Sequence, residues 1–567
     1  MLFVASLSAP AADPPAPEDA LVELVSGPQG LGEKAFARGE YKHVRTAYAK
    51  FVEAKYGRDS KLGIPDDATR LFAWLDENPE IKETLFTALD PDGDDLSEAM
   101  IVFRDLWKAH PDAVKAHPNA AIAAAVVWDN PKQAPYDYRG HQRRTQSILP
   151  EAEAKVGPAE NFKFLIDRDA KLKGPQLQLP WEFLVHVVNH KTPLDERDWA
   201  ISKYLPRRGG VGTIYKDIEY DKEMLRTQSE RCKLNDKPYT LASIREHGGV
   251  CAMQADFAAR VAKSLAVPAE YVGGEANSGV LHAWVMWAEV KAVNKDAVTF
   301  TLESFGRYNI DQYYIGTLRD PKTGRDTTDR QLEQRLTAVG QSPANSRHAD
   351  LLMRMYPIVR EKKQLPTKLQ HVYLNRVLTL YPMCEAAWVE VAALHKGGKL
   401  TDAVEATRLV DKALLTFAKF PDFSWKIVDD LLTPQKDKFY RTRTFEKMAT
   451  SYETLGRPDL ACEARLKLVD YQTEAKEHKK AFDGLANTIR KFPSEGRYVP
   501  KMMTRLQEVA KDIKGGDALM TKFYLEILPR IPPRRGDEVS KFCVTMHEQA
   551  ITFLKDNGKP KDAALVE

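Results

Sequence analysis

Apolar residues recur at helical spacing through most of the chain, and only one stretch alternates as strands do. Between Asp19 and Trp128 they return every three or four positions, with Pro or Gly at short intervals. This pattern predicts a small all-helical unit. Helical spacing also runs from Arg347 to the C-terminus. In between, runs rich in β-branched and aromatic residues, such as 282–287 and 299–302, predict strands mixed with helices.

These changes of pattern predict an α+β protein made of five parts. A mixed core at 179–346 is flanked by the helical unit at 19–128 and by a helical region at 347–567. The segment 129–178 is rich in Pro, Gly and charge, so we expect a connection with little regular structure. Residues 1–18 are apolar and then Pro-rich.

The start of the chain is similar to the end of a signal peptide. An apolar stretch from Leu2 to Leu7 precedes an Ala9-Pro10-Ala11 pattern, although no basic residue occurs before Lys34. The pattern favours a periplasmic or secreted location over a cytoplasmic one.

Internal repetition marks the C-terminal region. One set of residues falls at tetratricopeptide spacing, a second repeats the opening of that pattern, and 481–493 fits a third partial copy. The two sets are Phe445, Met448, Ala449, Tyr452, Gly456 and Ala461, then Trp388, Val391, Ala392 and His395. Helix pairs of this kind stack into a curved array that commonly holds a peptide or protein partner. An array that only buttresses its neighbour is the alternative.

Composition narrows the possible partners and cofactors. The 567 residues include 83 Lys and Arg against 80 Asp and Glu, a balance without the concentrated positive charge that nucleic acid requires. No run of about 18 apolar residues predicts a transmembrane helix. The five cysteines form no CxxC pair and have no metal-ligand spacing with the histidines.

A short acidic segment resembles the opening of a calcium loop. Residues 90–95 supply the acids, but Asp95 stands where the loop needs Gly and Ile101 where it needs Glu. A turn followed by a helix N-cap is the favoured interpretation.

The segment 244–265 contains the most informative chemistry. Gly248 and Gly249 give way abruptly to a helix whose apolar stripe must be buried, with Cys251 in its first turn. The positive end of a helix dipole favours thiolate over thiol, and the thiolate is the nucleophile. Cys232, Cys384, Cys462 and Cys543 are expected to be structural, and His247 is only a weak catalytic candidate.

A predicted hairpin follows this helix. His282 begins one strand, a turn is expected at 294–296, and the returning strand runs from Val298 to Glu303. An imidazole and a carboxylate on adjacent strands are what a thiol nucleophile needs: a base, and an acceptor that fixes the base's tautomer.

These residues together resemble the transglutaminase-like, papain-related superfamily. The resemblance rests on GGVC at 248–251, VPAEYV at 267–272 and HAWV at 282–285, and it covers about 120 to 140 residues. It implies a Cys-His-Asp arrangement that acts on amide bonds through an acyl-enzyme thioester. By position, Cys251 is the nucleophile and His282 the general base and acid.

The third member departs from the family pattern. Where the family usually has Asp followed by Pro, this chain has Glu303 followed by Ser304, so Glu303 is the expected residue, with Asp296 and Asp311 as fallbacks. Direct pairing of His282 with Glu303 would centre the hairpin near 292–293, which requires a bulge or an asymmetric loop. The Cys251 backbone N–H is expected to be one oxyanion donor.

Two functions remain open from the sequence. The first is a cysteine enzyme that hydrolyses peptide or isopeptide bonds, with Gln-to-amine transfer second, and it needs no metal or organic cofactor. The second is a non-catalytic transglutaminase-like scaffold that binds protein partners through its helical repeats.

Overall fold

The computed structural model describes residues 16–28, 30–56, 65–129, 138–172, 174–227, 231–276, 281–306, 315–535 and 538–567. Residues 1–15 lie outside these ranges, so the signal-peptide prediction stays a prediction. Within the described ranges, no helix has both the length and the apolar character needed to cross a bilayer.

The N-terminal part is helical, as the apolar spacing predicts. Pro occupies the start of several of its helices, where the missing N–H costs no hydrogen bond. Asp95 caps one helix by accepting a hydrogen bond from the Glu98 N–H, so the calcium-like segment is indeed a turn and an N-cap. The helices are α1 (Pro17–Leu24), α2 (Tyr41–Tyr56), α3 (Pro65–Glu77), α4 (Pro79–Ala88), α5 (Leu96–Ala109), α6 (Pro111–Ala116) and α7 (Pro118–Val127).

The segment 129–178 is more regular than its composition suggests. It contains the short helix α8 (Arg139–Arg144) and the 15-residue helix α9 (Pro158–Leu172). α9 buries Phe162, Phe164 and Leu165 and packs against α5 and α7. The expectation of little regular structure was therefore wrong, because Pro and charged residues here begin and coat a helix rather than prevent one.

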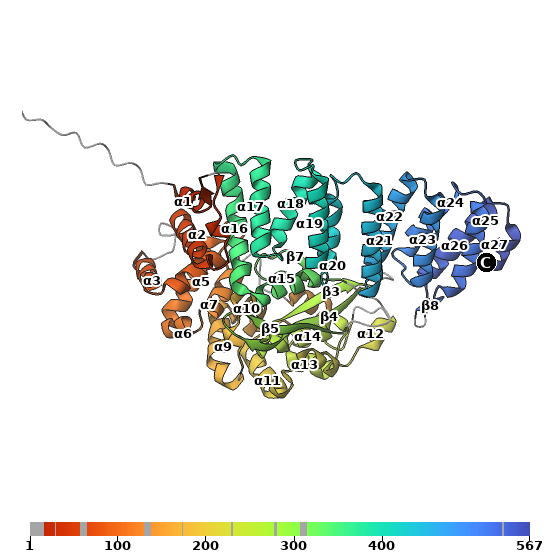
Figure 1. The fold of residues 1–567 in the computed structure, drawn as a ribbon. Helices are drawn as coiled ribbons and strands as arrows, with labels where there is room; N and C mark the ends of the chain where they lie inside the picture. Colours follow the sequence, from red (N-terminus) through yellow and green to blue (C-terminus); the bar gives the residue numbers. More distant parts are fainter. Residues whose placement is uncertain are drawn as a thin grey trace, which may run out of the picture.

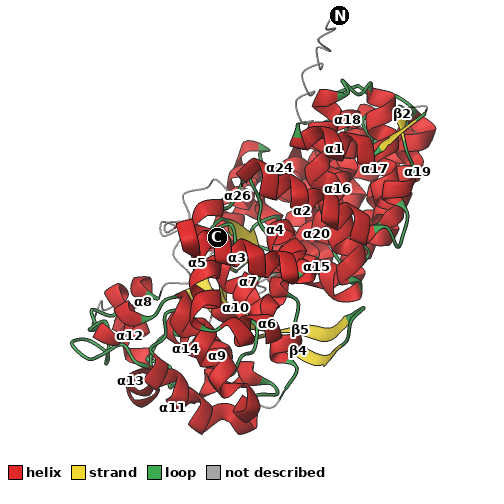
Figure 2. Cartoon of the chain, turned by 90° about the vertical axis from the view of Figure 1, so that its left-hand side faces the viewer, coloured by secondary structure: helices red, strands yellow, loops and turns green. Residues whose placement is uncertain are grey.

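A five-stranded antiparallel sheet with the strand order β5-β4-β3-β6-β7 forms the centre of the mixed core. In Figure 2, β4 and β5 project beyond the helices around them. The strands are β3 (Ala269–Glu275), β4 (Leu281–Val293), β5 (Val298–Phe305), β6 (Gly316–Arg319) and β7 (Asp326–Thr328). The α+β class is confirmed in this coarse form: a mostly helical protein with one central sheet.

Helices surround this sheet. α14 (Cys251–Ser264) packs on β3 and β4, and its residues 252–264 are all buried. α10 and α15 meet β5 at Phe300, through the ring of Phe183 and the backbone of Gly340. The other helices of the core are α10 (Trp181–Val188), α11 (Leu194–Tyr204), α12 (Lys222–Thr227), α13 (Leu241–His247) and α15 (Asp329–Gln341).

The C-terminal region is helical to its end. At the first predicted repeat, α21 buries Phe445 and Tyr452, and Gly456 takes a positive φ of 68° in the turn before α22. The helices are α16 (Pro343–Lys362), α17 (Thr367–Leu380), α18 (Glu385–Lys396), α19 (Ala403–Thr416), α20 (Pro421–Leu431), α21 (Lys438–Thr454), α22 (Pro458–Glu474), α23 (His478–Lys491), α24 (Val499–Ala510), α25 (Gly516–Ile527), α26 (Lys541–Asp556) and α27 (Pro560–Val566). Tetratricopeptide identity stays a prediction.

Hydrophobic packing crosses the domain limits expected from the sequence. Figure 1 shows α1 and α2 beside α16 and α17, and α16 packs on both α1 and α2. One buried apolar cluster extends from Leu21 to Tyr471, and a second from Cys462 to Val566. The N-terminal helices, the mixed core and the first C-terminal helices therefore share a core.

A buried acidic pair joins the N-terminal helices to the mixed core. Lys322, from the turn between β6 and β7, lies 3.3 Å from the Asp94 carboxylate and donates to the Ala88 carbonyl. Asp129, which is 2% exposed, accepts a hydrogen bond from the Asp95 N–H. Burial and the nearby charge of Asp94 raise the pKa of Asp129 to about 7.

We predict that Asp129→Asn stabilises the protein above neutral pH. Because the folded state raises the Asp129 pKa from 3.8 to about 7, stability falls as the pH rises through that window. The amide imitates the protonated acid, so the gain in unfolding free energy should be present at pH 8, at most about 4 kcal/mol, and should shrink toward pH 5. Urea unfolding at both pH values measures it. The exposed Asp92→Asn is the control, and a gain that does not depend on pH would contradict the prediction.

Candidate active site

Cys251 is the first residue of α14, and the two glycines before it lie close to the backbone of residues 219–221. The Gly249 N–H donates to the Glu219 carbonyl, and the Asp221 N–H donates to the Gly249 carbonyl. Gly248 has a φ of +73°, and a Cβ there would lie 2.4 Å from the Glu219 oxygen. Glycine is thus required at 248 by this close approach, while a Cβ at 249 would lie 2.8 Å from the Met253 side chain. Together these contacts fix the start of the helix and the position of Cys251.

The half-buried Cys251 thiol lies against the strand that carries His282. The backbone N–H of Ala283 interacts with it, as do N–H groups of the first turn of the helix. Burial raises the pKa of Cys251, while these N–H groups and the charge of Arg144 act in the opposite direction. The expected stabilisation by the helix N-terminus is present, but desolvation outweighs it, so the resting group is a thiol.

His282 is held by a backbone carbonyl. The buried imidazole places Nε2 2.5 Å from the Gly306 oxygen. Because a carbonyl only accepts, Nε2 carries the proton, and Nδ1 is the basic nitrogen of the neutral ring.

The Gly306 carbonyl, which accepts this hydrogen bond, is held in place by packing against Tyr215. Gly306 has a φ of +103°, and a Cβ there would meet the Tyr215 ring at 2.7 Å. The Tyr215 hydroxyl donates to the Ala283 carbonyl at 3.1 Å. Tyr215 thus ties the end of β5 to the part of β4 that carries His282.

The structure does not bring Glu303 to His282. Glu303 pairs with Trp287, five residues along β4 from His282, about 16 Å away at strand rise and on the opposite face. The reason is the turn: Asn294 Oδ1 accepts from the N–H groups of Asp296 and Ala297, which centres the hairpin beyond 292–293. The turn predicted at 294–296 and a bulge between Val290 and Ala292 are both present, and together they set this register.

Of the two fallback acids, the structure describes only Asp296. Asp296 lies in that turn, at the far end of β4 from His282. Asp311 lies outside the described residues. The acceptor that the structure gives His282 is the Gly306 carbonyl, which sequence reasoning missed because any residue supplies a carbonyl.

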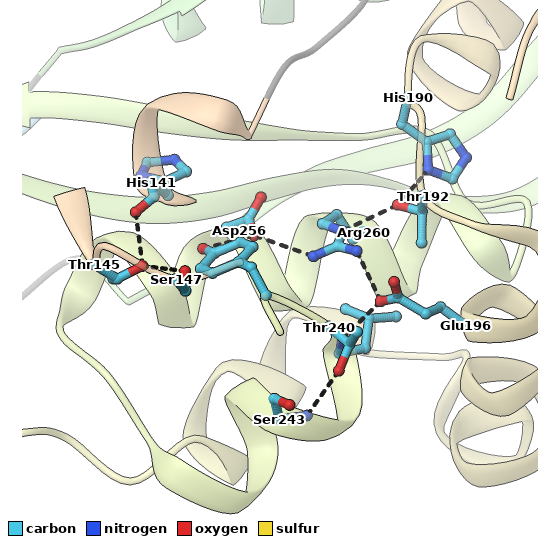
Figure 3. Close-up of polar contacts among 12 residues, drawn as sticks. His141, Thr145, Ser147, His190, Thr192, Glu196, Thr240, Ser243, Asp256 and Arg260 are labelled. Atoms are coloured by element: carbon cyan, nitrogen blue, oxygen red, sulfur yellow. Dashed lines mark hydrogen bonds and ion pairs between the residues drawn. The ribbon is translucent and has the colours of Figure 1, made fainter. Parts of the chain in front are cut away.

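A buried ionic network holds α14 along its length (Figure 3). Arg260, fully buried, donates to Glu196 at 2.8 Å and to Thr192 at 3.0 Å, and it lies 3.7 Å from Asp256. Tyr239 donates to the same Asp256 at 3.1 Å. Burial lowers the Arg260 pKa, but the carboxylates outweigh burial and raise it overall.

A second buried cluster lies at the C-terminal end of α14. Lys263 donates to Asn189 and, at 3.2 Å, to Glu270 on β3, while His186 lies 2.6 Å from the same carboxylate. Both clusters were missed from the sequence, although Asp256 and Arg260 have the four-residue spacing of a helical ion pair.

The remaining candidates have structural surroundings. His247 contacts the Lys237 ammonium, and the Cys232 thiol, whose pKa is raised by burial, lies 3.9 Å from the Thr145 carbonyl. Trp284 is fully buried. Cys384, Cys462 and Cys543 are buried, as expected.

No group of three or more His, Cys, Asp or Glu side chains within the described ranges is arranged to hold a metal ion. Comparisons of the chain with protein-family models, with curated proteins and with solved structures find no significant match. The transglutaminase-like hypothesis therefore rests on the residues of the site alone.

We predict that Arg260→Leu destabilises the protein by about 3–5 kcal/mol. It would leave the buried Glu196 and Asp256 carboxylates without their cation. Urea unfolding measures the loss, and Arg260→Lys should recover part of it. Arg143→Leu, on an exposed side chain, should change stability by no more than about 0.5 kcal/mol. A loss below about 1 kcal/mol for Arg260→Leu would show that the network is dispensable.

Proposed function

We propose that the protein is a cysteine enzyme that acts on peptide or isopeptide bonds, with Cys251 as nucleophile and His282 as general base and acid. One observation carries the proposal. The thiol at the start of a buried helix lies against the residue after His282, whose Nε2 is held by Gly306 so that Nδ1 is the basic nitrogen.

The reaction follows from these protonation states. His282 takes the thiol proton as Cys251 Sγ attacks the carbonyl carbon and forms a tetrahedral oxyanion. His282 then gives the proton to the departing nitrogen, the C–N bond breaks, the amine leaves, and the acyl group remains on Cys251 Sγ as a thioester. Water, deprotonated by His282, attacks the thioester and releases the acid and the thiol.

A backbone N–H can stabilise the negative charge that develops on the oxyanion. The Cys251 N–H lies at the N-terminus of α14, the positive end of the helix dipole, where it can donate to the oxyanion. No step needs a metal or an organic cofactor. An amine could replace water at the thioester, and we favour hydrolysis because water is the more abundant acceptor.

The second candidate is a non-catalytic scaffold with the same fold. Burial that raises the Cys251 pKa, and a Glu303 carboxylate that is placed away from His282, both favour it. Partners would then bind the helical C-terminal region. Deleting that region is a poor test, because α16 packs on α1 and α2.

The test is site-by-site labelling of the five cysteines with iodoacetamide, followed by mass spectrometry. With an imidazole to take the thiol proton, Cys251 should react at pH 7 at least about tenfold faster than the other four cysteines. In His282→Ala the advantage should vanish, and Cys251 should react only in alkaline solution, because burial raises the pKa of its thiol.

His247→Ala is the matched control, since this histidine contacts Lys237 rather than the site. It should leave Cys251 labelling within about twofold of wild type. Equal labelling of all five cysteines in the wild type, or a fast Cys251 in His282→Ala, would reject the proposed pair and favour the scaffold.

A further inference from the structure

We propose that Arg144 makes this site selective for acyl donors that carry a carboxylate beside the reacting carbonyl. The inference rests on the proposed function of Cys251 and adds the substrate class. Arg144 lies in the segment 129–178, which we predicted from the sequence to be a connection.

A ring contact places α8 against β3, on the face of the sheet that Tyr271 shares with Ala283 and Val285. The His141 ring lies 4.8 Å from that of Tyr271 on β3, and Tyr271 pairs with Val285, two residues after Ala283 on β4. Arg144 is three residues beyond His141 and so shares its helix face. Thr145, the next residue, contacts the Cys232 thiol through its carbonyl.

The Arg144 guanidinium is free to bind an anionic ligand. Its side chain is exposed, and it makes no hydrogen bond or ion pair with any residue that the structure describes. Arg139, at the start of the same helix, is instead paired with Glu153 at 3.4 Å. The positive charge of Arg144 acts to lower the pKa of the Cys251 thiol, against the larger effect of burial.

A guanidinium in this position matches a carboxylate. Its planar fork donates two parallel hydrogen bonds to such a group, and Arg is preferred wherever two-point recognition is needed. On a peptide donor the carboxylate comes from an acidic side chain or from a free α-carboxyl group.

A pair of alkylating reagents tests the charge without a known substrate. Iodoacetate is anionic and iodoacetamide neutral, yet both consume the same Cys251 thiolate and release iodide. The ratio of their rates therefore cancels any change in the thiol pKa and reports the local field.

In Arg144→Gln the iodoacetate-to-iodoacetamide ratio at Cys251 should fall roughly fivefold at low salt, the change expected from one charge at close range. Arg143→Gln removes the same charge from a neighbouring exposed position and should change the ratio less than about twofold. Added salt should reduce the wild-type ratio toward that of Arg144→Gln.

The outcomes separate the two proposals. If Cys251 reacts slowly with both reagents, the proposed function fails. If it reacts fast but Arg144→Gln leaves the ratio unchanged, the carboxylate selectivity fails and the function stands.

Three peptide esters then identify the source of the carboxylate: an α-ester of Glu, an α-ester of Gln, and a γ-ester of Glu with a free α-carboxylate. At least one Glu ester should exceed the Gln ester in kcat/KM, and Arg144→Gln should remove that preference. Equal turnover of all three by the wild type would overturn the selectivity.

Discussion

The buried charges of α14 are the constraint on which the rest of the core depends. A helix with no exposed side chain from its second residue to its last would ordinarily be apolar, yet this one carries Asp256, Arg260 and Lys263. Each finds partners on other elements: Glu196 and Thr192 before the helix, and Glu270 on the strand after it. Packing alone tolerates a small slide of a helix, whereas these directional contacts do not, so the network fixes where α14 begins.

That fixed beginning is what gives Cys251 a defined place. Gly249 donates a backbone hydrogen bond to Glu219 and accepts one from Asp221, and β4 brings the Ala283 N–H to the thiol. Tyr215 connects the same strand to Gly306, which holds His282. Cys251 and His282 are therefore positioned mainly by backbone groups: the Ala283 N–H at the thiol and the Gly306 carbonyl at the imidazole.

The sequence predicted the parts of this arrangement that depend on local pattern. Helical spacing identified both helical regions, and the turn signal at Asn294 was correct. The same turn pairs Glu303 with Trp287 instead of His282. The register of the hairpin depends on where the turn closes, and the pattern of residue types does not show which residues of the two strands will face each other. The role of Gly306, the order in α9 and the shared core around α16 depend on contacts between distant segments, which no local spacing reveals.

The acceptor for His282 is a main-chain carbonyl, that of Gly306, rather than a carboxylate. A carboxylate loses its charge in acid, and a single substitution removes it, but a main-chain oxygen does neither. The direction in which the imidazole points is therefore insensitive to acidity, and point mutation reaches this oxygen only indirectly, by bulk at residue 306 or by loss of the Tyr215 ring. In related sequences that keep this arrangement, we expect a small residue at position 306 and an aromatic residue at position 215, rather than an invariant acid.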